Sequence, residues 1–243
     1  TINGPYRIPN YTIDANLVYT NNGIASAFRG FGAPESNFAI ESMMNELADE
    51  LKLDPIEIRL KNILKSGEIG PFNNEIRHAE GLEEALNRAK ELFYRPDPSG
   101  PFQRTGVGIA VSIKGVGFGT LPEFPAAAIE IAPEGKVRIM FSNVDYGQGI
   151  NTGNAQLVAE KLQIPLSQIE VLHSDTKFAP DTGGSSASRS TFNGGGALLL
   201  ACDKALSELK IEAASLFMTK SDALSYKDGY FYYKDKSISV YEV

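Results

Sequence analysis

The hydrophobic positions of the first third of the chain predict extended segments followed by three helices. Residues 1–32 carry β-type side chains between turn sequences at 3–5 and 21–23, which predicts strands there. Apolar residues then recur at helical spacing over 35–52 and 81–93. Between them, Asp54-Pro55-Ile56-Glu57 predicts a helix over 55–65, with a capping aspartate, a first-turn proline and a capping-box glutamate. The helix over 35–52 is predicted to bury Phe38, Met43, Met44, Leu47 and Leu51.

The remaining pattern mixes strands and helices without strict alternation. Pro133-Glu134-Gly135 predicts a hairpin turn between two strands, and Tyr226–Tyr230 predicts a second hairpin. A long helix over 197–220 is predicted to bury Leu200, Leu206, Leu209, Ile211 and Leu216. The other predicted elements are strands at 106–114, 127–131, 136–142 and 169–173 and a helix at 154–162.

A proline-rich segment divides these elements into two groups. Arg95–Pro101 holds three prolines and a glycine and fits neither a helix nor a central strand, so it is the predicted linker. We therefore expect an α+β fold of two mixed α/β lobes, residues 1–95 and 96–243.

Composition narrows the class of protein. The chain of 243 residues is 42% hydrophobic, with a formal charge of −7 and no basic stripe, which disfavours nucleic-acid or anionic-membrane partners. A single cysteine, Cys202, excludes an internal disulfide and a cysteine-based metal or iron–sulfur site in this chain. No spanning segment or leader is recognisable. These features predict a cytoplasmic protein.

Glycines gather where loops enter predicted elements, and such loops suit a bound anion because backbone N–H groups approach it closely. The alternative is ordinary turn chemistry. Neither a P-loop nor a dinucleotide-binding Gly-x-Gly-x-x-Gly sequence occurs. The clusters comprise Gly30 and Gly32; Gly115, Gly117 and Gly119; Gly147 and Gly149; and Gly183, Gly184, Gly194, Gly195 and Gly196.

Polar side chains accompany two of these clusters. Pro180–Thr191 holds six hydroxyl residues and Arg189, a density suited to a buried anion or diphosphate, although a surface loop has the same composition. Gln148 lies between two glycines, where its amide can both donate to and accept from a ligand. His78, His173 and Cys202 show no ligand or catalytic spacing and are interpreted as surface or core residues.

Three segments together resemble one family. They are Ala27–Glu35 (A-F-R-G-F-G-A-P-E), Val144–Gly149 (V-D-Y-G-Q-G) with Thr152 and Gln156, and Ser185–Thr191 before Gly194–Ala197. In this order, and with the D-P-I-E-I-R-L-K-N text of 54–62, the chain resembles the molybdopterin-binding part of the xanthine dehydrogenase and aldehyde oxidase family. The resemblance covers almost the whole chain.

The resemblance implies a molybdenum hydroxylase, whose cofactor is a molybdopterin, expected in a dinucleotide form. Water supplies the oxygen, and electrons pass to iron–sulfur clusters and FAD on partner domains or subunits. The main chain of Phe28, Arg29 and Gly30 is expected near the molybdenum ligands, with Arg29 at the metal. Gln148 matches an amide that meets the pterin or an oxo ligand. The remaining expected cofactor contacts are Gly147, Gly149, Ala187, Ser188 and Ser190.

The resemblance also bears on the substrate and on completeness. Phe31 and Phe118 match two phenylalanines that enclose a flat heteroaromatic ring, which favours a purine or nicotinate over an aldehyde. The family's base glutamate, in a Gly-x-Gly-Glu sequence, has no counterpart here, so no general base is assigned. We therefore expect a fragment or split subunit that is not active alone. The alternatives are an aldehyde or carbon monoxide oxidiser of the same family, and a non-catalytic assembly module.

Overall fold

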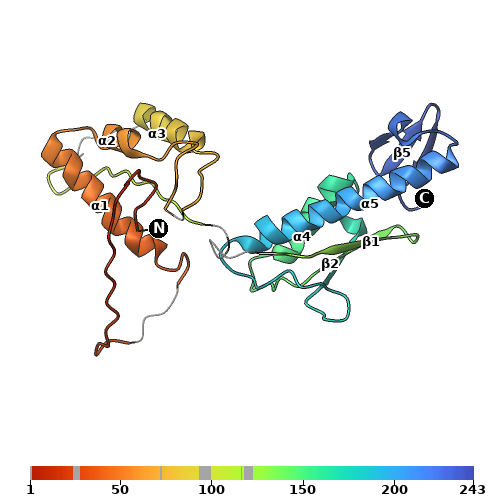
Figure 1. Ribbon diagram of the computed structural model, residues 1–243, viewed down its shortest axis with the longest axis horizontal. Coiled ribbons are helices and arrows are strands. Elements are labelled where there is room, and N and C mark those ends of the chain that lie inside the picture. The colour runs from red at the N-terminus through yellow and green to blue at the C-terminus, as the bar shows by residue number, and fades with distance from the viewer. Residues whose placement is uncertain (1, 24–27, 72, 93–99, 116, 118–122) are drawn as a thin grey trace. The chain divides into compact units, whose positions relative to one another are not determined.

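The structure is a computed structural model that describes residues 2–23, 28–71, 73–92, 100–115, 117 and 123–243. The chain divides into two compact units, unit 1 (Thr1–Gly115) and unit 2 (Val116–Val243) (Figure 1). The helices and small sheets confirm the α+β class. The predicted lobe boundary at 95/96 falls among residues outside the described part, and the division into lobes 1–95 and 96–243 stays a prediction.

Unit 1 contains the three predicted helices: α1 (Ala33–Leu51), α2 (Pro55–Asn62) and α3 (Glu80–Leu92). Asp54 caps α2 as predicted, because its carboxylate accepts hydrogen bonds from Ile56 N at 2.8 Å and Glu57 N at 3.1 Å. The capping-box role of Glu57 is wrong. Its carboxylate instead pairs with Lys90 of α3 and so joins the two helices.

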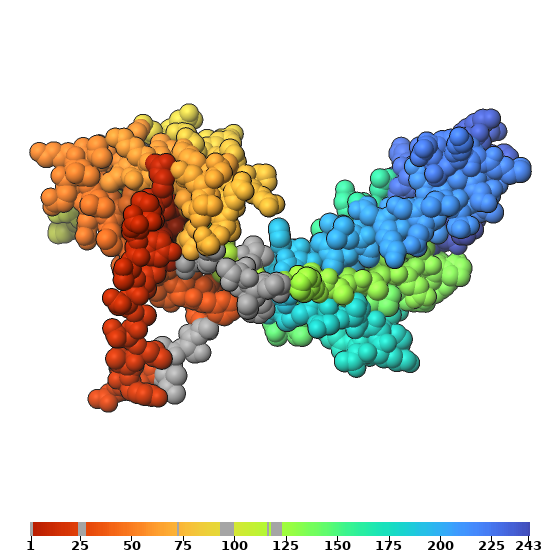
Figure 2. All heavy atoms as spheres, in the orientation of Figure 1, coloured from red at the N-terminus to blue at the C-terminus, as the bar shows by residue number. Residues whose placement is uncertain are grey.

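The strands predicted for unit 1 do not form in its described residues. Segments 2–23 and 100–115 run as irregular chain, apart from an isolated bridge between Tyr6 and Ile63. Residues 8–23, coloured red in Figure 2, extend away from the helices of unit 1. Leu17 and Tyr19 in this segment are fully exposed. β-type side chains were present in both segments, but a strand also needs a neighbour to accept its backbone hydrogen bonds.

The buried face of α1 differs from the predicted one. Only Met44 of the predicted set is buried, and Phe38, Met43, Leu47 and Leu51 are exposed. Glu41, Met44 and Ala48 face the core instead.

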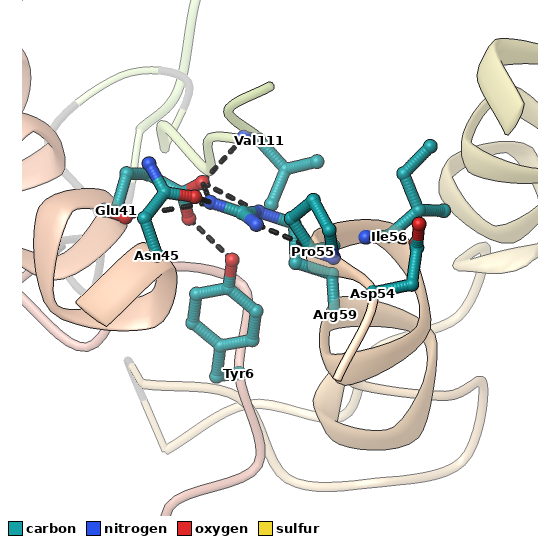
Figure 3. A network of polar contacts seen from close by, with 8 residues as sticks. All are labelled: Tyr6, Glu41, Asn45, Asp54, Pro55, Ile56, Arg59 and Val111. Atoms are coloured by element: carbon teal, nitrogen blue, oxygen red, sulfur yellow. Dashed lines mark hydrogen bonds and ion pairs between the residues drawn. The ribbon is translucent and has the colours of Figure 1, made fainter. Parts of the chain in front are cut away.

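A buried polar network explains this face. Glu41 accepts hydrogen bonds from Arg59 Nε at 2.9 Å, from Val111 N at 3.0 Å and from the Tyr6 hydroxyl, and Arg59 also donates to Asn45 Oδ1 at 2.8 Å (Figure 3). The charge of Glu41 is therefore compensated inside the unit, which allows a carboxylate to occupy a core position.

Unit 2 is built on a three-stranded sheet of β1 (Ala128–Ala132), β2 (Lys136–Phe141) and β3 (Ile169–His173). The sheet order is β1-β2-β3, with β1 antiparallel to β2 through the predicted turn at 133–135 and β3 parallel to β2. The crossover from β2 to β3 contains α4 (Ile150–Leu162), which packs beside α5 (Gly195–Leu216) on the sheet (Figure 1). The core between them comprises Val137, Ile139, Phe141, Ala155, Val158, Leu162, Ile164, Leu198 and Cys202.

A second small sheet packs against the C-terminal end of α5. It contains β4 (Ser225–Lys227), β5 (Tyr230–Tyr233) and β6 (Lys236–Ser239), and the first two form the predicted hairpin. Of the predicted apolar set of α5, Leu200, Ile211 and Leu216 are exposed, whereas Leu206 and Leu209 pack against the core. Among the described residues, no helix combines the length and the hydrophobicity that a membrane span requires.

Candidate functional site

The first predicted site segment is a tight turn before α1. Phe31 N donates to Phe28 O at 2.8 Å and Ala33 N donates to Gly30 O at 3.1 Å, so the turn is closed by its own backbone. Gly30, Phe31 and Gly32 all have positive φ, and Gly32 caps α1. The side chains of Phe28 and Phe31 are exposed. This geometry keeps both aromatic rings and the backbone of Arg29 accessible on unit 1.

The second segment, Asp145–Gly149, leads from β2 into α4. Asp145 Oδ1 accepts from Gly147 N at 2.9 Å and from Gly149 N at 3.1 Å. These two backbone N–H groups, Gly147 first, hold the pKa of the Asp145 carboxyl below its usual value. The Asp145 carboxylate, which the sequence analysis did not single out, therefore orders the turn that leads into α4.

Gln148 in this structure serves its own loop. Its Nε2 donates to Val144 O at 2.9 Å and its Oε1 accepts from Tyr146 N. One amide N–H of Gln148 stays available on the exposed side of the turn. Its predicted contact with a cofactor is not tested by this arrangement and stays a prediction.

The third segment is Ser185–Ser190. The residues just before it are hydrogen-bonded to the residues just before the second segment. Ser142 and Thr182 exchange two hydrogen bonds, Ser142 N to Thr182 Oγ1 at 3.0 Å and Thr182 N to Ser142 Oγ at 2.8 Å. Asn143 Nδ2 also donates to Gly183 O at 3.2 Å. The loops that precede α4 and α5 therefore start from one shared pair of strand-like segments at the same end of unit 2.

The Ser185–Ser190 loop has an unusual backbone. Ala187 and Ser188 are consecutive residues with left-handed φ values of 47° and 63°. Ala187 O accepts from Gly117 N at 2.8 Å. The next residue, Arg189, forms a buried ion pair with Glu123 at 2.6 Å. A π-helical turn, η2 (Ser190–Gly194), then leads into α5, a geometry often found at functional sites.

Among the described residues, buried polar atoms without a hydrogen-bond partner concentrate around these two loops. They include the hydroxyls of Ser185 and Ser186, Asn143 Oδ1, Asn151 Oδ1 and both amide atoms of Asn154. A buried polar group that lacks a partner is unfavourable by about 1–3 kcal/mol, so native proteins rarely keep several together. The cluster indicates a place where something else supplies hydrogen bonds.

Glycines in and near these loops have two kinds of surroundings. A Cβ at Gly117, Gly183 or Gly194 would collide with Glu123, Arg189 or Asn143 respectively, so these glycines make room for the protein's own polar side chains. A Cβ at Gly147, Gly149 or Gly184 would meet no atom within 4 Å. The second group, unlike the first, leaves open space where a ligand could approach the backbone.

The other candidates behave as the sequence suggested. Cys202 is buried in the core, and burial raises the pKa of its thiol to about 11, which keeps it protonated. His173 stacks on Phe141 and contacts Asn151 Nδ2 at 3.1 Å, and His78 is exposed. No group of three or more His, Cys, Asp and Glu side chains within the described ranges could hold a metal ion. Phe118 lies outside the described residues.

Sequence reasoning missed several residues that shape the site. Glu123, Asn143 and Thr182 all lie in irregular segments, and their partners are 40 or more residues away. No local spacing signals such long-range pairs. Asp145 did carry a signal, since an aspartate before a glycine often accepts a hydrogen bond from the backbone N–H two residues further on in a turn.

Comparison with known proteins gives a consistent family assignment. A family model described as a molybdopterin cofactor-binding domain matches residues 82–243, and a second model with the same description matches residues 1–63. Together these matches include all three of the site segments described above.

Curated relatives support the same family. The chain is 34% identical over 192 residues to a probable xanthine dehydrogenase subunit of Bacillus subtilis, covering 77% of this chain and 26% of that protein. It is 32% identical over 262 aligned positions to the gamma subunit of the 6-hydroxypseudooxynicotine dehydrogenase complex of Paenarthrobacter nicotinovorans, covering 99% and 32%. The chain thus spans about a quarter to a third of the length of these relatives.

Solved structures share the fold. The aldehyde oxidoreductase from Desulfovibrio desulfuricans matches with a TM-score of 0.66 and 29% identity, over 75% of this chain and 21% of that one. The quinoline 2-oxidoreductase from Pseudomonas putida, at 23% identity, matches in fold with a TM-score of 0.67 over 88% and 30%. From the site segments, the family models and the relatives, the chain belongs to the molybdopterin-binding subunits of the xanthine dehydrogenase and aldehyde oxidase family.

Proposed function

We propose that this chain supplies cofactor-binding loops to a molybdenum hydroxylase that oxidises a C–H bond of an aromatic N-heterocycle. The observation that carries the proposal is the coincidence of two features at one end of unit 2. The family's loops before α4 and α5 converge there, and buried polar atoms without partners gather around them.

The residues present fit a molybdopterin. A pterin with its phosphate offers many hydrogen-bond donors and acceptors, and the orphaned hydroxyls of Ser185 and Ser186 are suited to pair with them. The open backbone at Gly147, Gly149 and Gly184 allows close approach of such a group. The proposed contacts from unit 2 are Gly147, Gln148, Gly149, Ala187, Ser188 and Ser190, extended by Ser185 and Ser186.

Unit 1 contributes the turn before α1. The main chain of Phe28, Arg29 and Gly30 would donate hydrogen bonds near the metal. Phe31 would contact a flat substrate ring. When bound, the cofactor would supply the oxidation of the substrate carbon, with water as the oxygen source. The chain's own residues would orient the pterin and the substrate. No general base is assigned to this chain.

Two relatives favour an N-heterocycle, namely a probable xanthine dehydrogenase subunit and a subunit of a dehydrogenase for a nicotine derivative. Aldehyde oxidation is the second candidate, because the aldehyde oxidoreductase of Megalodesulfovibrio gigas is 30% identical over 84% of the chain. Phe31→Ala separates them. Loss of a stacking face should raise KM for a heterocycle more than for an aldehyde, and equal effects would favour the aldehyde function.

The proposed partners are the rest of the molybdopterin subunit together with iron–sulfur and flavin-containing proteins. The relatives named as subunits of dehydrogenases support such an assembly. We propose the cytoplasm as the compartment, since the lone Cys202 thiol is free and buried. A dinucleotide form of the cofactor and lack of turnover by the chain alone belong to the same proposal.

The decisive test is metal and pterin analysis of the complete complex, with the chain joined to its neighbouring segments. Molybdenum and pterin should copurify, and a complete complex without them would overturn the proposal. Ser185→Ala and Ser186→Ala should lower molybdenum content while leaving the stability of the cofactor-free protein unchanged or improved, because each removes an unpaired buried hydroxyl.

Two further variants refine this test. Ser207→Ala is the matched control, since its hydroxyl bonds Asp203 O within α5, and it should keep the wild-type molybdenum content. Gln148→Ala should lower cofactor occupancy or activity. An unchanged enzyme would remove Gln148 from the proposed contacts.

A further inference from the structure

A buried ion pair lies directly beside the left-handed turn of Ala187 and Ser188. Arg189 Nε donates to Glu123 Oε2 at 2.6 Å, and a second nitrogen of the same guanidinium donates to Gly184 O at 2.9 Å. The two side chains are only 6% and 11% exposed. Glu123 lies in irregular chain, and Arg189 caps the π-helical turn η2, so the pair joins an irregular segment to the start of the helical chain before α5.

The contacts of this pair with Gly184 and Asn193 lie on either side of the Ala187-Ser188 turn. Gly184 precedes the turn, Arg189 follows it, and Asn193 of η2 donates to Glu123 Oε2 at 2.6 Å. The loop is therefore fastened on both sides of Ala187 and Ser188. Left-handed backbone is disfavoured for residues with a Cβ, and it persists where the surroundings determine it.

The surroundings are shaped to receive the pair. The carboxylate of Glu123 lies where a Cβ of Gly117 would be, and the guanidinium of Arg189 lies where a Cβ of Gly183 would be. Gly117 N, in turn, donates to Ala187 O at 2.8 Å. A guanidinium has donors in a fixed planar fork, so it can hold a carboxylate and a carbonyl in one defined orientation.

We infer that Glu123 and Arg189 are positioning residues, which hold the Ala187-Ser188 turn in the conformation that presents it to the cofactor. The part of this inference that concerns the cofactor rests on the proposed function. The pair acts through the loop and does not itself touch the cofactor. Its effect is to keep Ser185, Ser186 and Ser188 in one arrangement before a ligand arrives, which reduces the ordering needed on binding.

The experiment compares three variants of the complete complex. Arg189→Lys keeps the charge and loses the fork, and Glu123→Gln keeps the shape and loses the charge. The double variant Glu123→Gln/Arg189→Met removes both charges. Each is measured for melting temperature, for hydrogen exchange of backbone amides in peptides covering 183–194, and for molybdenum content.

Positioning and general stabilisation give different results. Both single variants should exchange at least about tenfold faster in the loop and hold less than half the wild-type molybdenum. In the double variant the melting temperature should recover, because no buried charge is left unpaired, while loop exchange stays fast and molybdenum stays low. Recovery of all three measurements together would reduce the pair to a stabilising role and overturn the inference.

A control variant checks that instability alone does not empty the site. Val240→Ala truncates a buried residue at the C-terminal sheet and should lower the melting temperature without changing loop exchange or molybdenum content. Unchanged loop exchange in the single variants would also overturn the inference. Absence of molybdenum from the wild-type complex would overturn the proposed function instead, and the exchange data would still decide whether the pair orders the turn.

Discussion

Each unit contains a buried arginine–glutamate pair, and the two pairs are embedded differently. In unit 1, Glu41 and Arg59 lie on α1 and α2, and their network also includes Tyr6 and Val111 (Figure 3). In unit 2, Glu123 lies in irregular chain and Arg189 caps the turn η2, on either side of one loop. The first pair joins packed elements, and the second determines a backbone conformation. The same chemistry can thus stabilise a core or order a site.

The largest effect is expected from Arg59→Met. It would leave the Glu41 carboxylate buried without its cation and lower the free energy of unfolding by about 3–5 kcal/mol. Urea denaturation, followed by a signal from the unit that contains the substitution, measures this loss. Arg138→Met is the control, because Arg138 pairs with exposed glutamates at the surface of the sheet in unit 2 and should lower the free energy of unfolding far less. Equal losses would remove the distinction between core and surface pairs.

The next effect is expected from Tyr6→Phe, which removes the hydroxyl that donates to Glu41. A hydrogen bond to a charged group contributes about 1.5–3 kcal/mol, so unfolding free energy should fall by that amount at neutral pH.

The pH dependence of this variant adds a second measurement. Burial first, and the Glu41 contact second, raise the pKa of Tyr6 above its usual value of 10.0. A raised folded pKa contributes stability that is complete below the unfolded pKa and is lost as pH rises. The gap between wild type and Tyr6→Phe should therefore narrow above about pH 10. A gap independent of pH would contradict the network.

A matched pair of glycine variants tests the second ion pair. Gly183 has a φ of 78°, and an added Cβ would collide with Arg189, whereas a Cβ at Gly184 meets nothing within 4 Å. Gly183→Ala should lower the free energy of unfolding by about 1–2 kcal/mol from the backbone alone. Gly184→Ala should change it by less than about 0.5 kcal/mol. Similar losses at both positions would contradict both the backbone strain at Gly183 and the collision with Arg189.

Local signals predicted much of this fold. The cap at Asp54, the turn at 133–135 and the hydrophobic spacing placed helices and strands to within a few residues in most cases. The buried face of α1 could not be predicted, because a carboxylate occupies it and its partners Tyr6, Arg59 and Val111 are distant in sequence. The strands predicted before residue 115 failed because hydrophobic pattern does not reveal whether a pairing strand exists.

The candidate site shows the same division. Its loops were found from glycine and hydroxyl patterns together with the family resemblance. The function of individual glycines was not predicted, because Gly183 and Gly194 make room for buried side chains, whereas other glycines leave open space. Whether a glycine faces a ligand or its own protein depends on long-range packing. The role of Asp145 was also missed, although its hydrogen bonds in the turn are local and could have been recognised from the sequence.

The smallest effect is expected from Asp145, whose bonds are local and solvent-exposed. Asp145→Ala removes the acceptor for Gly147 N and Gly149 N and should lower stability slightly at neutral pH. The same bonds lower the pKa of this carboxyl, so its contribution is present above the unfolded pKa, about 3.9, and is lost as pH falls through the lower folded value. Melting temperatures of wild type and Asp145→Ala should therefore converge in acid. If the two melting temperatures differed equally at neutral and acidic pH, Asp145 would act through packing and not as a charged hydrogen-bond acceptor. The loop before α4 would then be held, like the loop before α5, by more than local and exposed hydrogen bonds.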